Sequence, residues 1–216
     1  MKASSLSLRK SRIYPITDRR LTGMSHAEQV VKLCQGGATL IQLREKELSS
    51  VDFYRQALEA FAETRNRGAR LIVNDRVDIA LALGVDGVHL GRNDLPPVAA
   101  RRLLGEDAVI GYSTHTVEQA VEGSKLPVDY LAIGPIFSTS SKTDAEQVVG
   151  LDGLRKVRAA VRNTQLVAIG GISHENASLV LEAGADAVAV LSAVLTPPTA
   201  IVDSMKRLFA TTSQPS

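Results

Sequence analysis

Several short polar clusters in this chain carry side chains that bind anions. The first is Gln42-Leu-Arg-Glu-Lys46, with an amide, a guanidinium and an ammonium at every second position. Side chains alternate between two faces of an extended strand, so Gln42, Arg44 and Lys46 point one way and the residues between them point the other. Cations aimed together in this way suit a phosphate-like anion. The alternative is a solvated strand end whose cations pair with the neighbouring glutamates.

Two carboxylates follow in neighbouring segments, in Asn74-Asp75 and in His89-Leu-Gly-Arg-Asn-Asp94. Asp75 and Asp94 could hold one Mg²⁺ through a few oxygens and leave its other positions for water and substrate phosphate. Each also precedes a helical stretch, where a carboxylate commonly caps the helix N-terminus. The residues alone leave metal binding and capping open.

Hydroxyls and one further cation come later in the chain. Gly111-Tyr-Ser-Thr-His115 offers Ser113, and its His115 is either an acid or base or a hydrogen-bonding support. The segment after Gly134 holds Thr139, Ser141 and Lys142. Such a hydroxyl-rich loop is either a phosphate or diphosphate site or simply flexible, and the cation Lys142 favours the anion site.

Glycines provide a second kind of anion site. Gly170-Gly171-Ile-Ser173 and Leu191-Ser192 each follow an apolar run. Glycine lets backbone N–H groups approach an anion closely, although it also serves simply to make a tight turn. We favour a phosphate site that includes Gly171, Leu191 and Ser192.

The elements that must position these residues form a regular series of strand-then-helix units. The apolar runs are continuous rather than alternating, which is typical of a parallel sheet buried on both faces. The expected strands are 12–17, 40–44, 70–74, 87–90, 109–113, 130–136, 166–169 and 187–191. Eight such units predict an α/β fold with a single (β/α)8 TIM barrel.

A barrel of this type places functional residues after the C-terminal ends of its strands, where all the polar clusters above fall. Asp86 and Asp186, in the similar segments 83–88 and 183–188, instead precede strands, so we expect structural roles for them. Two anion sites at one mouth indicate two phosphorylated small-molecule substrates. Joining them calls for an activated leaving group, such as a diphosphate neutralised by Mg²⁺ and cations.

Length and composition fit one compact enzyme domain. The chain has 216 residues, a net charge of +2 and a single cysteine, Cys34, at an apolar helical position. Mixed charges argue against nucleic-acid binding, and the apolar runs are too short to span a membrane. We expect a cytoplasmic protein with flexible tails at 1–11 and 210–216 around a catalytic barrel at 12–209, either monomeric or a homo-oligomer.

Taken together, the motifs resemble those of the thiamine phosphate synthase family. The resemblance spans nearly all of residues 12–209 and rests on the order and spacing of five segments. These are Gln42-Leu-Arg-Glu-Lys46, Asn74-Asp75-Arg76, Val88-His-Leu-Gly-Arg-Asn-Asp94, Gly134-Pro-Ile-Phe and Ala168-Ile-Gly-Gly-Ile172.

The resemblance implies that the chain joins hydroxymethylpyrimidine diphosphate to a thiazole phosphate, giving thiamine phosphate and diphosphate through a pyrimidine carbocation. It implies Mg²⁺ as cofactor, held by Asp75 and Asp94. The pyrimidine diphosphate would bind to Gln42, Arg44, Lys46, Asn74, Ser113 and Lys142. The thiazole phosphate would bind to Thr139, Ser141, Gly171, Leu191 and Ser192. Of these, Arg44, Lys46, Ser113 and Lys142 would take part in catalysis.

One departure and two alternatives accompany the resemblance. The family commonly has threonine where this chain has Ser141, a change that keeps the hydroxyl and loses a methyl group. A related thiazole tautomerase shares the phosphate pocket and uses a histidine, for which His115 is a candidate. A barrel that only binds a thiamine precursor and regulates a partner is the second alternative. The complete set of diphosphate and metal residues favours the synthase.

Overall fold

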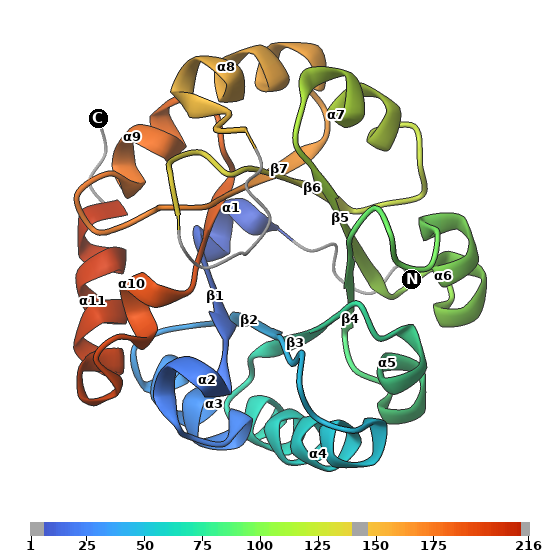
Figure 1. The fold of residues 1–216 in the computed structure, drawn as a ribbon, viewed down its shortest axis with the longest axis vertical. Helices are drawn as coiled ribbons and strands as arrows, with labels where there is room; N and C mark the ends of the chain where they lie inside the picture. Colours follow the sequence, from blue (N-terminus) through green and yellow to red (C-terminus); the bar gives the residue numbers. More distant parts are fainter. Residues whose placement is uncertain (1–6, 140–146, 213–216) are drawn as a thin grey trace.

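The computed structural model describes residues 7–139 and 147–212, and it confirms the predicted barrel. Eight parallel strands pair in chain order, and β8 closes on β1 (Figure 1). The strands are β1 Ile13–Thr17, β2 Leu40–Leu43, β3 Arg70–Asn74, β4 Gly87–Leu90, β5 Val109–Thr114, β6 Tyr130–Ile133, β7 Gln165–Ile169 and β8 Ala187–Val190. Because all eight run the same way, their C-terminal ends meet at one mouth.

Four strands are shorter than predicted: β1, β2 and β8 by one residue each and β6 by three. β6 ends at Ile133 rather than at residue 136, because Gly134 is followed by Pro135, which has no backbone N–H to donate to the ladder. β2 ends at Leu43, one residue early, so Arg44 already belongs to the loop at the mouth.

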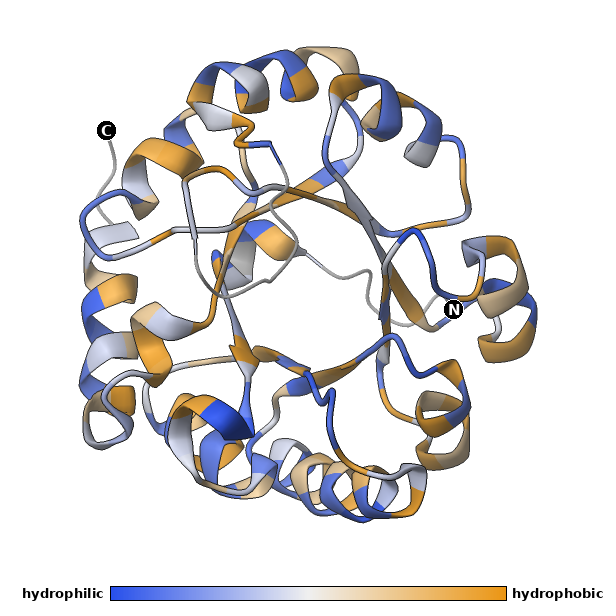
Figure 2. Ribbon diagram, viewed as in Figure 1, coloured by the Kyte–Doolittle hydropathy of each residue, from blue (hydrophilic) through white to orange (hydrophobic). Residues whose placement is uncertain are grey.

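Helices surround the barrel, and most of them bury one side against it. They are α2 Arg19–Thr22, α3 His26–Gln35, α4 Ser50–Asn66, α5 Val77–Leu83, α6 Pro97–Leu104, α7 Val117–Gly123, α8 Gly150–Ala160, α9 Ala177–Glu182, α10 Ser192–Leu195 and α11 Ile201–Thr212, with the 3-10 turn η1 Pro198–Ala200. In α4 the buried residues are Phe53, Ala57, Ala60 and Thr64, a spacing of three to four that marks one helix face. Figure 2 shows the resulting alternation of apolar and polar stretches around the helical ring.

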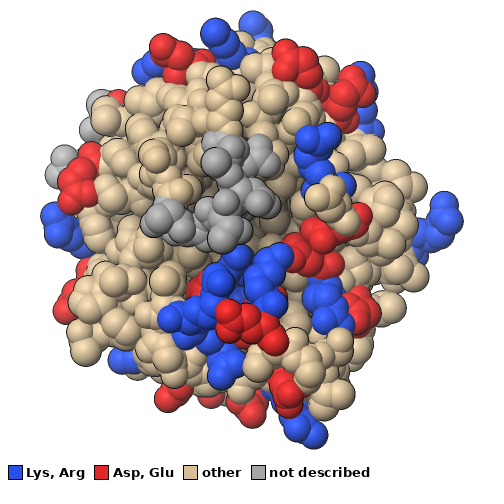
Figure 3. All heavy atoms as spheres, viewed as in Figure 1, with Lys and Arg blue, Asp and Glu red and all other residues tan. Residues whose placement is uncertain are grey.

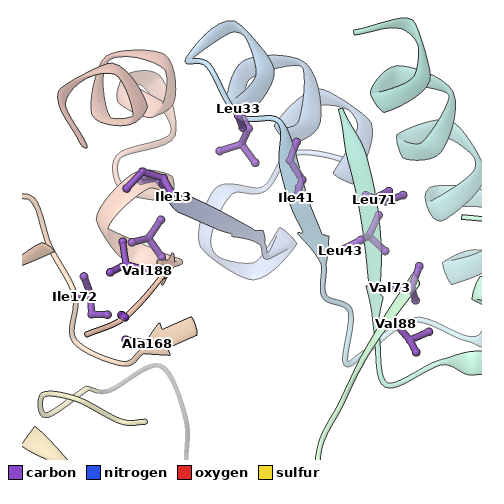
Figure 4. Packing of buried hydrophobic residues seen from close by; sticks show 14 of the residues in the cluster. Ile13, Leu33, Ile41, Leu43, Leu71, Val73, Val88, Ala168, Ile172 and Val188 are labelled. Carbon is purple, nitrogen blue, oxygen red and sulfur yellow. The ribbon is translucent and has the colours of Figure 1, made fainter. Parts of the chain in front are cut away.

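The core has two layers, because successive strand residues point to opposite faces of the sheet. The outer layer fills the space between strands and helices and includes Leu33 of α3 and Ile41 of β2 (Figure 4). The inner layer fills the barrel and includes Tyr14, Tyr130 and Val167. The barrel interior is therefore packed with side chains, and the open space lies above them at the mouth.

Helical structure extends past residues 12 and 209, the expected limits of the barrel domain, at both ends. Residues Leu8–Ser11 form a short helix, α1, which Figure 1 shows in the centre of the ring of strands. Leu8 is fully buried in the inner layer, and its backbone N–H donates to Gln165 Oε1 at 2.9 Å. At the other end α11 continues to a buried Thr212. The polar composition of both segments concealed these buried anchoring residues, and residues 1–6 and 213–216 of the two predicted tails lie outside the described residues.

The aspartates expected to have structural roles do lie at the N-terminal ends of the strands. Asp86 accepts the backbone N–H of Leu71 at 2.9 Å, and Asp186 accepts that of Leu166 at the same distance. A third residue, Asp129, accepts the N–H of Ile110 at 2.7 Å. Each carboxylate thus links the start of one strand to the strand before it.

Cys34 is half-buried and packs against the outer layer, as its apolar position predicted. Within the described ranges, no helix combines the length and the apolar character that crossing a bilayer requires.

Candidate active site

A cavity of about 240 Å³ opens at the mouth of the barrel, and the polar clusters singled out in the sequence converge on it. Its walls come from the loops after most of the strands. The predicted site residues that line it are Gln42, Arg44, Asn74, Ser113, Thr139, Gly171, Leu191 and Ser192. Both predicted anion sites thus border one cavity instead of two separate ones.

The loop after β2 holds Arg44 rigidly at the cavity wall. Its guanidinium Nη1 forms a 2.8 Å ion pair with Asp18 Oδ2, and Asp18 is almost fully buried. Its backbone N–H donates to Thr17 Oγ1 at 3.4 Å. Thr17 is the last residue of β1 and Asp18 follows it. Residues at the end of β1 therefore hold Arg44, which follows β2.

Glu45 points away from the cavity, as the alternation predicted, and supports the same loop from behind. Its Oε1 accepts the backbone N–H groups of Lys46 and Glu47, at 2.7 and 2.8 Å. Its Oε2 lies 3.3 Å from Nε2 of His26, whose Nδ1 is 2.8 Å from Thr17 Oγ1. The carboxylate therefore ties the loop backbone to the start of α3.

Burial controls the protonation of this pair. Desolvation lowers the pKa of His26, although the neighbouring Glu45 carboxylate opposes that shift. For Glu45, desolvation acts to raise the pKa, but the backbone and His26 hydrogen bonds outweigh it and the net pKa is lowered. The ionised carboxylate is the form that can accept all of these hydrogen bonds.

Lys46, Asp75 and Asp94 form a charged cluster on the rim, outside the cavity itself. Lys46 Nζ lies 2.5 Å from Asp75 Oδ2, and Asp94 Oδ2 accepts the Gly91 N–H at 2.6 Å. Burial raises the pKa of Asp94, and the close Asp75 carboxyl raises it further. Figure 3 shows basic and acidic side chains gathered on this face, over the ends of β2 and β3 in Figure 1. The cluster is an arrangement in which two carboxylates approach each other beside one cation.

The geometry argues against the capping interpretation of these two aspartates. The N-cap residue of α5 is Arg76 and that of α6 is Pro96, and neither helix start has a side-chain capping hydrogen bond. Asp75 itself has a φ of 63°, in the left-handed region, which aspartate tolerates better than most residues. Neither carboxylate is occupied by a helix end.

A chain of hydrogen bonds crosses the floor of the cavity. Gln42 Nε2 donates to Tyr14 Oη at 3.2 Å, and Tyr14 Oη lies 3.1 Å from Tyr130 Oη. Tyr130 Oη lies 3.0 Å from His89 Nδ1, and His89 Nε2 lies 2.9 Å from Ser113 Oγ. The predicted ligand-binding residues Gln42 and Ser113 are thus joined through three buried aromatic side chains.

His115 lines the cavity beside the loop that follows β6. Its Nδ1 lies 2.6 Å from the carbonyl oxygen of Gly134, and its backbone N–H donates to Gln119 Oε1 at 2.8 Å. Of the two roles left open for it, these contacts favour that of a support for the loop.

The opposite wall is made by glycines and a serine. Gly170 and Gly171 have φ values of 99° and 64°, and a Cβ on Gly171 would lie 2.7 Å from Ser138 O. Ser192 begins the short helix α10 directly after Leu191. The predicted residues Ser141 and Lys142 belong to the segment outside the described residues.

Sequence reasoning missed the groups that hold the predicted ones in place. Asp18 and Thr17 follow the same positional rule as the other strand ends, and applying it to β1 would have found them. Tyr14 and Tyr130 lie in apolar strand segments, and the sequence does not show that their hydroxyl groups meet inside the barrel. His89 stood in a motif but had no assigned role.

The part of the chain that the structure describes has no cluster of three or more histidine, cysteine, aspartate or glutamate side chains arranged to hold a metal ion. Asp75 and Asp94, the pair predicted from the sequence, could hold a cation that needs few protein ligands, as Mg²⁺ does when it keeps several waters and substrate phosphate oxygens.

Comparison with known proteins agrees with this geometry. A family model described as thiamine monophosphate synthase matches residues 13–194. The thiamine-phosphate synthase of Syntrophomonas wolfei is 47% identical over 184 residues, covering 85% of this chain and 88% of that protein. That of Chloroflexus aurantiacus is 44% identical and covers 94% of both chains. The solved thiamine phosphate pyrophosphorylase of Pyrococcus furiosus superposes with a TM-score of 0.86 at 38% identity, covering 95% of this chain and 96% of the other. This chain belongs to the thiamine monophosphate synthase family.

Proposed function

We propose that the thiamine-phosphate synthase activity of this chain transfers the hydroxymethylpyrimidine group from its diphosphate ester to a thiazole phosphate at the barrel mouth. The pyrimidine substrate is 4-amino-2-methyl-5-hydroxymethylpyrimidine diphosphate, and the acceptor is 4-methyl-5-(2-phosphoethyl)thiazole or its carboxylated form. The observation that carries the proposal is the single cavity, which has a fixed cation on one wall and a glycine-serine pocket on the other.

The pyrimidine diphosphate is assigned to the side formed by β2 to β5. Gln42, Asn74 and Ser113 line the inner cavity there, and Arg44 lies at its wall. Lys46 stands on the adjoining rim, where an extended diphosphate would reach it. Lys142 completes the proposed set from outside the described residues.

Mg²⁺ is assigned to Asp75 and Asp94. Burial raises the pKa of Asp94, and the close Asp75 carboxyl raises it further, so the protein alone does not fully compensate the two negative charges. A divalent cation would relieve this repulsion, and when bound it would supply charge neutralisation for the departing diphosphate. Lys46, already paired with Asp75, would share that task.

The thiazole phosphate is assigned to the opposite wall. Gly171, Leu191 and Ser192 border the cavity there, together with Thr139 at the edge of the described segment, and Ser141 is the remaining assigned residue. The positive φ at Gly171 favours glycine, and a Cβ there would lie 2.7 Å from Ser138 O, so the two loops pack closely at this wall. The proposed phosphate contact is to main-chain N–H groups beside the glycine.

In the proposed reaction the carbon–oxygen bond to diphosphate breaks first, and the thiazole nitrogen then forms a bond to the resulting pyrimidine carbocation. The electron pair leaves with diphosphate, where Arg44 and Lys46 stabilise the developing charge and Ser113 can donate a hydrogen bond. Ile16, Ala132 and Val167 add apolar surface to the cavity beside these groups. Apolar surface disfavours water, which would otherwise capture the carbocation.

A coupling assay tests this function directly. Purified protein is incubated with both substrates and Mg²⁺, and thiamine phosphate and diphosphate are measured, with EDTA added in a parallel reaction. We expect equal amounts of the two products and their loss in EDTA, with recovery when Mg²⁺ is restored. Absence of coupling by folded protein would overturn the proposal, and isomerisation of a thiazole phosphate in its place would establish the tautomerase.

A further inference from the structure

We propose that Tyr14, Tyr130 and His89 are positioning residues that set the hydrogen-bonding polarity of Gln42 and Ser113 at the two ends of one continuous chain. This inference rests on the proposed function, because it concerns how the pyrimidine side of the site is organised. None of the three aromatic residues needs to touch the reacting atoms for it to hold.

The direction of the chain follows from the donors and acceptors available to it. The amide Nε2 of Gln42 has no acceptor capacity, so Tyr14 Oη accepts there at 3.2 Å. The Tyr14 proton is buried, and the acceptor within reach is Tyr130 Oη at 3.1 Å. Tyr130 in turn donates to His89 Nδ1 at 3.0 Å.

The last link determines the tautomer of the histidine. A neutral imidazole that accepts at Nδ1 carries its proton on Nε2. His89 Nε2 therefore donates to Ser113 Oγ at 2.9 Å, and the Ser113 hydroxyl keeps its own proton for the cavity. Every donor in the chain points from β2 towards β5.

This polarity decides what each end offers to a ligand. One Nε2 hydrogen of Gln42 is donated to Tyr14, which fixes the orientation of the amide and leaves its Oε1 acceptor and a second Nε2 hydrogen for the cavity, whereas Ser113 presents an O–H donor. The site is thus matched to a ligand that has an N–H donor facing β2 and an acceptor facing β5. An exocyclic amino group on the pyrimidine supplies the first, and a ring nitrogen or an ester oxygen supplies the second.

Packing holds the chain in register. Tyr14 and Tyr130 are almost fully buried, and their rings meet edge to face at a centroid distance of 6.0 Å. His89 stacks on Tyr130 with an interplanar angle of 21°. Burial raises the pKa of both tyrosines, so that they act as neutral hydroxyls. Gly111 makes the stack possible, since a Cβ there would lie 2.3 Å from Tyr130 Oη and 2.6 Å from His89 Nδ1.

Tyr130→Phe tests the proposal, because it removes the central hydroxyl and keeps the ring. We expect the KM for pyrimidine diphosphate to rise roughly tenfold, the usual effect of losing one buried hydrogen bond, while the KM for thiazole phosphate stays unchanged. In a double-mutant cycle with Ser113→Ala, the two effects should be less than additive. Tyr112→Phe, which removes a hydroxyl on neighbouring β5 that does not line the cavity, is the matched control and should behave like wild type.

A second readout does not depend on turnover. In ¹⁵N NMR of the full chain, His89 should show the Nε2–H tautomer in wild type, with its signal identified by its absence in His89→Asn. Tyr130→Phe should shift that equilibrium, and Tyr112→Phe should leave it alone. Tyr14→Phe cuts the chain one link earlier and replaces Tyr130→Phe as the test if the latter does not fold.

The outcomes separate this inference from the proposed function. A wild-type protein without coupling activity contradicts the function, and the tautomer measurement still tests the chain. An active wild type whose Tyr130→Phe variant keeps its pyrimidine KM and its His89 tautomer overturns the chain alone. Additive effects of Tyr130→Phe and Ser113→Ala would equally contradict a chain that works as one unit.

Discussion

The two ends of the barrel use the same residue type in opposite ways. At the N-terminal end Asp186 accepts a backbone N–H and two arginines, Arg9 and Arg158, with distances between 2.8 and 3.0 Å. At the mouth Asp75 and Asp94 approach each other instead, and their combined partners are one lysine and one glycine N–H.

The difference separates carboxylates that the protein itself satisfies from carboxylates that are available to a ligand. A carboxylate saturated by its own protein contributes to stability and has little left for a ligand. Carboxylates held close to each other are costly until something positive arrives, and such perturbed groups gather at functional sites. Substitutions at the two ends should therefore change different properties of the protein.

Asp75→Ala should have the largest effect, and on activity rather than stability. If Asp75 binds Mg²⁺, its removal should lower kcat/KM roughly a thousandfold, because a bound metal contributes several kcal/mol of charge stabilisation. Steady-state coupling kinetics and a thermal melt measure the two properties. Asp86→Ala is the matched control from the other end, where the melting temperature should fall and kcat should hold. An active Asp75→Ala enzyme would remove the metal assignment.

Asp186→Ala should have the reverse signature. It leaves the Leu166 N–H and the partly buried Arg158 guanidinium without their carboxylate, which should cost about 3 kcal/mol of unfolding free energy. Urea denaturation followed by circular dichroism measures it. Arg9→Ala, which removes an exposed partner of the same carboxylate, serves for comparison and should leave the midpoint nearly unchanged. Equal losses in both variants would contradict the dominance of the buried contacts.

Glu45→Gln should have a moderate effect that is confined to one substrate. A neutral amide accepts the Lys46 and Glu47 N–H groups less strongly, so the loop that carries Arg44 and Lys46 should loosen. We expect a rise of about tenfold in the KM for pyrimidine diphosphate, with the thiazole phosphate KM constant. Glu47→Gln changes an exposed neighbour and should do nothing. A uniform loss of kcat for both substrates would point to general unfolding of the mouth.

The smallest effect should be a pH dependence of stability that arises from His26. Burial lowers its folded pKa below the ordinary value of 6.5, so the unfolded chain binds the proton more readily. The stability from neutral His26 is therefore complete above pH 6.5 and is lost as the pH falls from there towards its folded pKa. Melting temperatures of wild type and His26→Gln between pH 8 and 5 measure it. Parallel curves for the two proteins would exclude His26 as the source.

The sequence predicted the fold well because a parallel barrel leaves a plain signal. Each strand is a short, continuous apolar run, and each polar cluster follows one, so eight repeats were sufficient to predict closure. The predicted end of β6 was wrong because the apolar run continues past Gly134. Only Pro135 shows that the hydrogen-bond ladder of the sheet stops there.

The lining of the cavity was predictable where a residue stands at a strand end, and the groups that orient those residues were not. Arg44 and Ser113 could be found by position alone. The Asp18 contact that orients Arg44 joins two strand ends 26 residues apart, and the Tyr14–Tyr130 contact joins two residues 116 apart. Such long-range pairs depend on register across a closed sheet, which local patterns do not encode.

Gly111 links this chemistry to the way related sequences should vary. Its missing side chain leaves the space in which the Tyr130 hydroxyl and the His89 ring meet. Any relative that places a larger residue at this position has to give up one of those two partners. We expect positions 111, 130 and 89 to change together across descendants of a common ancestor. A lineage that loses the glycine should also have lost the hydrogen-bond chain between β2 and β5.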